Sequence, residues 1–369
     1  MTANPVANGL LILILIAQFA ACAARARAQQ RDPQFESLAS RATEARNQQN
    51  IPLAIGLYRK AVDAKPDWAE GWFYTGLLQY SSNGFPAAID AFNHFLLLQP
   101  DVAPALALRG LSEFETGAYD DALRDLEQSV KRGAADEPRN EEVIRFHLAE
   151  LLARAGRFEE AVAQYDFFVA HHVKDSDLLA GLGLAGIRRQ ELPRDIPQQD
   201  RQFLEAVGSA GYAYLSGDYE DAGKEFNQLF AHYPTTPNLY LFYGSLLYKD
   251  SPSLAIEQFR AEVVHVPGNI YAHGLLAFTL TIEGRYAEAR PDAEIALAAA
   301  PEMEMAQVAL GRALAETGDV KRTTEILNKV LQKDPQNLEA HMGLADVYSR
   351  AGRREDAYRE RMVCLGLER

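Results

Sequence analysis

The sequence predicts an all-α protein, an α-solenoid of about nine helix–turn–helix repeats. One observation is a turn motif that recurs along the chain, most clearly as Gly117–Ala122, Gly156–Ala161, Gly217–Ala222 and Gly284–Ala289. The second is a set of small residues that recurs twelve positions before the alanine of each motif. A chain whose repeats contact only their neighbours can be this long without a single large core.

Each part of the turn motif has a physical role. The glycine ends one helix because it accepts a left-handed backbone conformation. The aromatic residue two positions later anchors the turn, and acidic residues such as Asp120 and Asp121 follow where the next helix begins. Negative charge is favourable at a helix N-terminus. The closing alanine allows two helices to approach closely, so the motif predicts a tight helical hairpin.

The spacing of the motif defines the repeats. The closing positions are Ala54, Ala88, Ala122, Ala161, Ala222, Ala255, Ala289, Thr323 and Ala357. Successive sites are 34, 34, 39, 61, 33, 34, 34 and 34 residues apart. Prolines follow twelve positions downstream at Pro66, Pro100, Pro234, Pro267, Pro301 and Pro335. Because proline cannot continue a helix, these residues end the second helix of a repeat.

A 34-residue helix–turn–helix period resembles the tetratricopeptide repeat (TPR). The resemblance covers roughly residues 35–369. It implies that the repeats stack into a right-handed superhelix, with the first helix of each repeat lining the concave side. We place the repeats at 35–68, 69–102, 103–136, 142–175, 203–236, 237–269, 270–303, 304–337 and 338–369.

One interruption divides the repeats into two blocks. Residues 29–175 are expected to form an N-terminal block of four repeats, and residues 203–369 a C-terminal block of five. Between them, residues 176–202 are expected to form an extra helix over 176–189 and a connector that contains Pro193 and Pro197.

Residues 1–28 are predicted to be a signal peptide. Leu10–Ala21 is an apolar segment too short to span a bilayer comfortably, and Ala26–Ala28 fits an A-x-A cleavage site. This predicts an exported protein of bacterial type, periplasmic or secreted. Phe19–Cys22 also resembles the lipobox of bacterial lipoproteins, so lipidation at Cys22 and anchoring in the envelope is an alternative. A third possibility is that the segment stays uncleaved and anchors the protein. Membrane contact is expected only through this segment.

Composition and charge exclude several classes. The net charge is −14 over 369 residues, which disfavours a nucleic-acid partner. Only Cys22 and Cys364 are present, so a disulfide framework is not expected.

No motif predicts catalysis, a cofactor or a metal. Gly181–Gly186 fits G-x-G-x-x-G, but it lies inside an apolar helical segment rather than after a strand, so close helix packing explains it. The eight histidines show no metal-ligand spacing, and the acidic pairs sit in first turns of helices. We therefore predict a non-catalytic protein; an enzyme with a site at the 176–202 interruption is the alternative.

The resemblance places the partner site on the concave face, which the first helices line. The candidate residues share positions on these helices: Phe73, Tyr74, Leu77, Tyr80, Leu111, Phe114, Phe146 and Glu150. This stripe is either an open groove for a protein or peptide, or a surface filled by neighbouring helices. Its apolar character does not support the carboxylate clamp of chaperone-adaptor TPR proteins. The favoured function is a protein-binding scaffold of the bacterial envelope or exterior; the alternative is a lipid-anchored outer-membrane assembly factor.

Overall fold

The computed structural model describes residues 32–133 and 138–367, and every regular element within these ranges is helical. The all-α prediction is therefore confirmed. The predicted signal peptide and Cys22 lie outside the described residues. The chain divides into two units, which we describe separately: unit 1 runs to Gly181 and includes Gln190–Ile196, and unit 2 contains Leu182–Arg189 and the chain from Pro197 onward.

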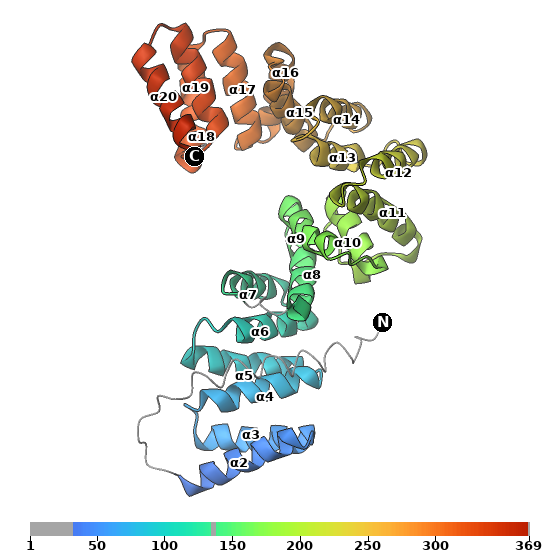
Figure 1. Ribbon diagram of the computed structural model, residues 1–369, viewed down its shortest axis with the longest axis vertical. Helices are drawn as coiled ribbons and strands as arrows, with labels where there is room; N and C mark the ends of the chain where they lie inside the picture. The colour runs from blue at the N-terminus through green and yellow to red at the C-terminus, as the bar shows by residue number, and fades with distance from the viewer. Residues whose placement is uncertain (1–31, 134–137, 368–369) are drawn as a thin grey trace. The chain divides into compact units, whose positions relative to one another are not determined.

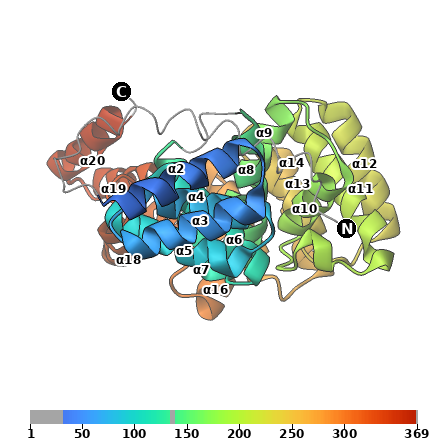
Figure 2. The same cartoon turned by 90° about the horizontal axis from the view of Figure 1, so that it is seen from below.

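Unit 1 holds the first four repeats as consecutive helical hairpins. Its helices are α2 (Pro33–Asn47), α3 (Ile51–Ala64), α4 (Ala69–Ser81), α5 (Phe85–Leu98), α6 (Ala103–Thr116), α7 (Tyr119–Lys131), α8 (Pro138–Arg154) and α9 (Phe158–Ala170). Each helix packs against the one before it and the one after it, as Figure 1 shows. Seen from below in Figure 2, the α2–α3 hairpin lies in front of the hairpins that follow.

Unit 2 repeats the arrangement with five hairpins (Figure 1). Its helices are α11 (Gln198–Leu215), α12 (Tyr219–His232), α13 (Leu239–Leu247), α14 (Pro252–His265), α15 (Ile270–Ile282), α16 (Tyr286–Ala299), α17 (Glu304–Glu316), α18 (Val320–Lys333), α19 (Leu338–Arg350) and α20 (Arg354–Leu367). Among the described helices, none has the length and hydropathy needed to cross a membrane.

The interruption between the repeat blocks contributes to both units. It contains α10 (Ser176–Gly186), a short 3₁₀ helix η2 (Pro193–Asp195) and the start of α11. The first half of α10 and the segment Gln190–Ile196 belong to unit 1, and the second half of α10 belongs to unit 2. We call Gln190–Ile196 the connector below.

The repeated turn adopts the backbone predicted for it. The turn glycines have φ between 71° and 85°: Gly117, Gly156, Gly217, Gly284, Gly318 and Gly352. In the second repeat, Asn83 occupies the position of the turn glycine and takes the left-handed conformation (φ 58°). Asparagine is among the few residues that tolerate this region, which explains how the weaker copy still makes the turn.

The small residues predicted at helix crossings lie where no larger side chain fits. All nine closing positions from Ala54 to Ala357 are buried. In the upstream set, a Cβ added at Gly76 would lie 2.8 Å from the ring of Phe92, and one at Gly311 would lie 2.3 Å from Leu327. The closing residues and the small residues upstream of them therefore determine how closely the two helices of a hairpin approach.

A side-chain donor near the start of several first helices explains part of the proline pattern. These donors bond the carbonyl of the preceding proline: Trp72 to Pro66, His273 to Pro267, Gln307 to Pro301 and His341 to Pro335. Each of these carbonyls lies two residues after the end of the preceding helix, outside its hydrogen-bond ladder. The donor satisfies that carbonyl at the junction between repeats.

Close packing also explains the glycines of the G-x-G-x-x-G match, as predicted. They lie within α10. A Cβ at Gly183 would meet the backbone oxygen of Leu204 at 2.1 Å, and one at Gly186 would meet the ring of Phe242 at 2.5 Å. Both neighbours belong to unit 2, so these glycines let α10 approach the helices after it.

Candidate functional site

Most of the predicted partner-binding residues are interior side chains of unit 1. Buried members of the set are Phe73, Tyr74, Leu77, Tyr80, Leu111, Phe114 and Glu150, and Phe146 is half-buried. The ring of Phe73 lies 5.3 Å from that of Phe95 and 6.1 Å from that of Phe92, both on α5. Glu150 is bonded to Nδ1 of His147 at 2.7 Å. In this structure these side chains contact neighbouring helices, and a polar hollow of unit 1 lies elsewhere.

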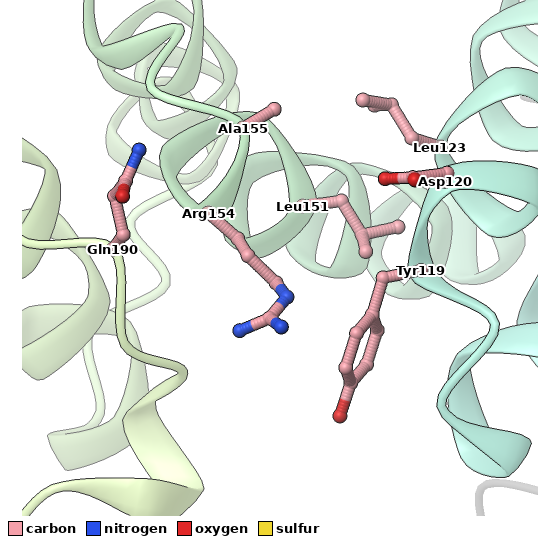
Figure 3. A pocket seen from close by; sticks show the side chains of 7 residues that line it. All are labelled: Tyr119, Asp120, Leu123, Leu151, Arg154, Ala155 and Gln190. Carbon is pink, nitrogen blue, oxygen red and sulfur yellow. The ribbon is translucent and has the colours of Figure 1, made fainter.

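Such a hollow lies in unit 1 where α7, α8 and the connector meet. It is a pocket of about 260 Å³ lined by Tyr119, Asp120, Leu123, Leu151, Arg154, Ala155 and Gln190. Figure 3 shows the Arg154 side chain reaching between Gln190 on one side and Tyr119 on the other. We call it the Arg154 pocket.

The repeat architecture positions the two sides of the pocket. Tyr119 and Asp120 open α7 after the left-handed Gly117 and the N-cap residue Ala118. Arg154 ends α8, where a cation is favoured by the helix dipole. Leucines from α7 and α8 form the apolar part of the lining.

Tyr119 holds the guanidinium of Arg154 in place. The Cζ atom of Arg154 lies 4.4 Å from the centroid of the tyrosine ring, within the range of a cation–π contact. The ring is fixed in turn by the edge of Phe114, at a centroid distance of 5.7 Å. Within the described ranges Arg154 makes no hydrogen bond or ion pair. Its charge is therefore oriented by the protein but left available to a ligand.

The connector completes the pocket and covers part of the predicted stripe. Leu192 is fully buried, and Pro193 is buried beside it. Arg194 lies over the ring of Phe114 at 4.7 Å, donates to the hydroxyl of Tyr119 at 2.9 Å and is 3.7 Å from Glu115. Arg194 of the connector thus covers the ring of Phe114, one residue of the predicted stripe.

Electrostatics keep Arg194 charged at this place. Although burial disfavours its charge, the hydrogen bond to Tyr119 and the negative charges of Glu115 and Glu150 together raise the pKa of Arg194. The Glu115–Arg194 pair is nevertheless partly open to solvent, since the Arg194 side chain is 42% exposed. The connector is therefore anchored mainly by the burial of Leu192, with Arg194 orienting Tyr119.

Sequence analysis identified Tyr119 and Asp120 only as turn and helix-start residues, and it missed Arg154 and Gln190. The repeat motif predicts where Arg154 lies on its helix. No signal in the sequence near Gln190 indicates that this residue lines the same pocket. Within the described residues, no group of three or more His, Cys, Asp or Glu side chains is arranged to hold a metal ion.

Comparison with known proteins agrees with the repeat pattern. One tetratricopeptide repeat model matches residues 40–93, 77–138, 146–213 and 283–322, and a second matches residues 314–360. No curated protein matches the sequence.

Several solved structures are similar in fold. The Cut9–Hcn1 hetero-tetramer of the APC/C matches at 15% identity and a TM-score of 0.37, covering 92% of this chain; the chain spans 66% of that protein's length. A tetratricopeptide repeat protein from Parabacteroides merdae matches at 14% identity, covering 77% of this chain and 100% of that one, with a TM-score of 0.34. Yeast Tom70 matches at 14% identity and a TM-score of 0.30, and the match covers 92% of this chain and 93% of that one.

Proposed function

Because the chain belongs to the tetratricopeptide repeat family, we propose that it is a non-catalytic scaffold that binds a protein or peptide, and that unit 1 holds this partner at the Arg154 pocket. Proteins of this family generally mediate protein interactions, and the repeat surface has no need of a cofactor to do so. The site, however, must be argued from this chain's own residues.

The observation that carries the proposal is the unpaired, oriented guanidinium of Arg154 at an open pocket. Ligand pockets combine an apolar lining with a few convergent polar groups. Here leucines provide the lining, while Arg154, Asp120 and the amide of Gln190 provide donors and acceptors. The volume of about 260 Å³ suits one side chain of a partner segment, with its flanking peptide groups at the rim.

A random-peptide library displayed on phage tests this site. Peptides selected on the full chain should bind at least about tenfold more weakly to Arg154→Ala, which corresponds to about 1.4 kcal/mol of binding free energy. Fluorescence anisotropy of the labelled peptides gives the dissociation constants. Arg124→Ala is the matched control, because Arg124 is an exposed arginine on α7 that pairs with Asp121 and does not line the pocket.

Two results would contradict the proposed site. One is a set of selected peptides that binds Arg154→Ala and Arg124→Ala equally well. The other is a library that yields no binder to the folded chain. Because Arg154 is exposed, its substitution should leave the melting temperature unchanged, so a loss of binding reports on the surface.

We further propose that the scaffold acts outside the cytoplasm, in the bacterial periplasm or after secretion. The apolar segment Leu10–Ala21 and the A-x-A site at Ala26–Ala28 support this location. Intact mass spectrometry of the exported protein should give a mature chain that begins at Gln29. A mature chain that begins at lipidated Cys22 would instead favour the lipid-anchored assembly factor, and a full-length mass in the membrane fraction would favour an uncleaved anchor.

A further inference from the structure

Among the residues that the structure describes, two of the three tyrosines at the same position in the repeated turn have an arginine near the ring and one does not. Tyrosine follows the turn glycine by two residues in the third, fifth and seventh repeats, as Tyr119, Tyr219 and Tyr286. Arginine guanidiniums lie near two of these rings: Arg154 at 4.4 Å from Tyr119, and Arg312 at 5.7 Å from Tyr286. Arg312 also lies 3.3 Å from the Tyr286 hydroxyl. The position therefore accepts a guanidinium twice in the same chain.

The fifth repeat builds the same aromatic arrangement as the third. Tyr214 is the penultimate residue of α11 and Tyr219 begins α12, and their rings meet edge to face with centroids 5.0 Å apart at 61°. The corresponding pair in the third repeat, Phe114 and Tyr119, meets at 5.7 Å and 69°. The third-repeat pair is covered by Arg154 and Arg194. The fifth-repeat pair thus has the geometry of a place that arginine occupies elsewhere.

Tyr219 is left open where Tyr119 is covered. Its side chain is 59% exposed, whereas large apolar rings are normally turned inward. In the described part of the chain, no cation lies over the ring of Tyr219 or Tyr214. Lys249 follows the next first helix much as Arg154 does, but its ammonium lies over Tyr248 at 5.8 Å. The chain's own nearby cation therefore does not fill the place.

Negative charge accompanies the open tyrosine pair. Burial, followed by the charge of Asp250, raises the pKa of Tyr214, so the Tyr214 hydroxyl lies in the field of this carboxylate. Within the described ranges, neither Asp250 nor Asp218, which precedes Tyr219, forms an ion pair. The neighbouring acids Glu220 and Asp221 are shared by Lys224. An open ring face in the field of an unpaired carboxylate suits a planar cation.

We infer that Tyr214, Tyr219 and Asp250 form a binding site for the guanidinium of an arginine side chain supplied by a partner protein. Arginine is favoured over lysine because both cations that cover the equivalent tyrosines are guanidiniums, and a guanidinium can stack on a ring and donate to a carboxylate at once. The net charge of −14 also favours approach of a basic segment. This site lies in unit 2 and is independent of the Arg154 pocket.

The test uses a capped tetra-arginine peptide as the probe, with tetra-lysine and tetra-citrulline peptides of the same length. Binding to the full chain is measured by fluorescence anisotropy at about 150 mM salt, where weak long-range attraction is largely screened. Tetra-arginine should bind saturably, tetra-lysine at least about threefold more weakly, and uncharged tetra-citrulline not at all. Tyr219→Ala and Asp250→Asn should each weaken tetra-arginine binding at least about fivefold.

Matched variants separate this site from general attraction of a cationic peptide to an acidic protein. Tyr233→Ala removes another exposed tyrosine of the fifth repeat and should leave the affinity unchanged. Tyr219→Leu keeps apolar bulk, so it preserves folding while losing affinity as Tyr219→Ala does. Equal losses in Tyr219→Ala and Tyr233→Ala, or equal binding of tetra-arginine and tetra-citrulline, would overturn the inference. Arg154→Ala should leave this affinity unchanged, so failure here does not bear on the Arg154 pocket.

Discussion

Phe73→Ala should lower the free energy of unfolding by about 3–5 kcal/mol, the range typical of truncating a buried aromatic residue. The Phe73 side chain is 1% exposed and contacts the rings of Tyr74, Phe92 and Phe95. Removing it leaves a cavity between α4 and α5 that rigid helical hairpins fill poorly. Urea denaturation followed by circular dichroism measures the loss, and amide hydrogen exchange in α4 and α5 locates it within the chain.

Leu97→Ala is the control for this substitution, because Leu97 is a large apolar residue on α5 that is 80% exposed. Its effect should stay within about 0.5 kcal/mol, as is usual for surface changes. If Phe73→Ala instead unfolds like the unmodified protein and loses peptide binding, Phe73 is a partner contact, as the open-groove alternative requires. A loss of stability in Phe73→Ala alone identifies it as a packing residue.

The helices could be predicted because their signals are local. Gly117, Ala122 and the prolines at six of the repeat boundaries act within a few residues of their own positions, so a 34-residue period located hairpins from α2 to α20. The weaker copy in the second repeat keeps the same register: Asn83 lies five residues before Ala88, as Gly117 lies before Ala122, and takes the left-handed conformation. Asparagine can replace glycine there because it tolerates this conformation.

Whether the face formed by the first helices is open or covered could not be predicted in the same way. A 3.6-residue period shows that Phe73, Leu77 and Tyr80 share a face, but it does not show whether another helix covers that face. The pocket depends even more on tertiary contact, because Gln190 reaches it through the connector after α10. Arg154 carried no signal of its own, since an arginine in the last turn of a helix is ordinary.

A buried carboxylate in the third repeat should make the stability of unit 1 depend on pH. Glu113 is 8% exposed, and its Oε2 atom has no hydrogen-bond partner in the described structure. Burial, followed by the charge of Asp125, raises the pKa of Glu113 to about 7, although Arg109 opposes the shift. Asp125 takes the bidentate hydrogen bonds of Arg109, at 2.5 and 2.9 Å, and leaves Glu113 only a contact of 3.8 Å.

The direction of the pH dependence follows from this raised pKa. Between the ordinary glutamate value and about 7, the folded state binds a proton that the unfolded state has already released. The contribution of Glu113 is therefore fully favourable at low pH and is lost as the pH rises toward 7 and above. A shift of this size corresponds to something on the order of 2 kcal/mol once partial solvent access is allowed for.

Glu113→Gln should accordingly match the unmodified protein near pH 4.5 and exceed its stability at pH 8 by on the order of 2 kcal/mol, because glutamine never charges in the buried position. Urea denaturation at several pH values between these limits measures the difference. Glu115→Gln is the control on the same helix: its carboxylate is partly exposed and pairs with Arg194, so its effect should remain below about 1 kcal/mol. If the difference between Glu113→Gln and the unmodified protein is constant from pH 4.5 to 8, Glu113 does not change its charge in this range, and Arg109 rather than burial controls its ionisation.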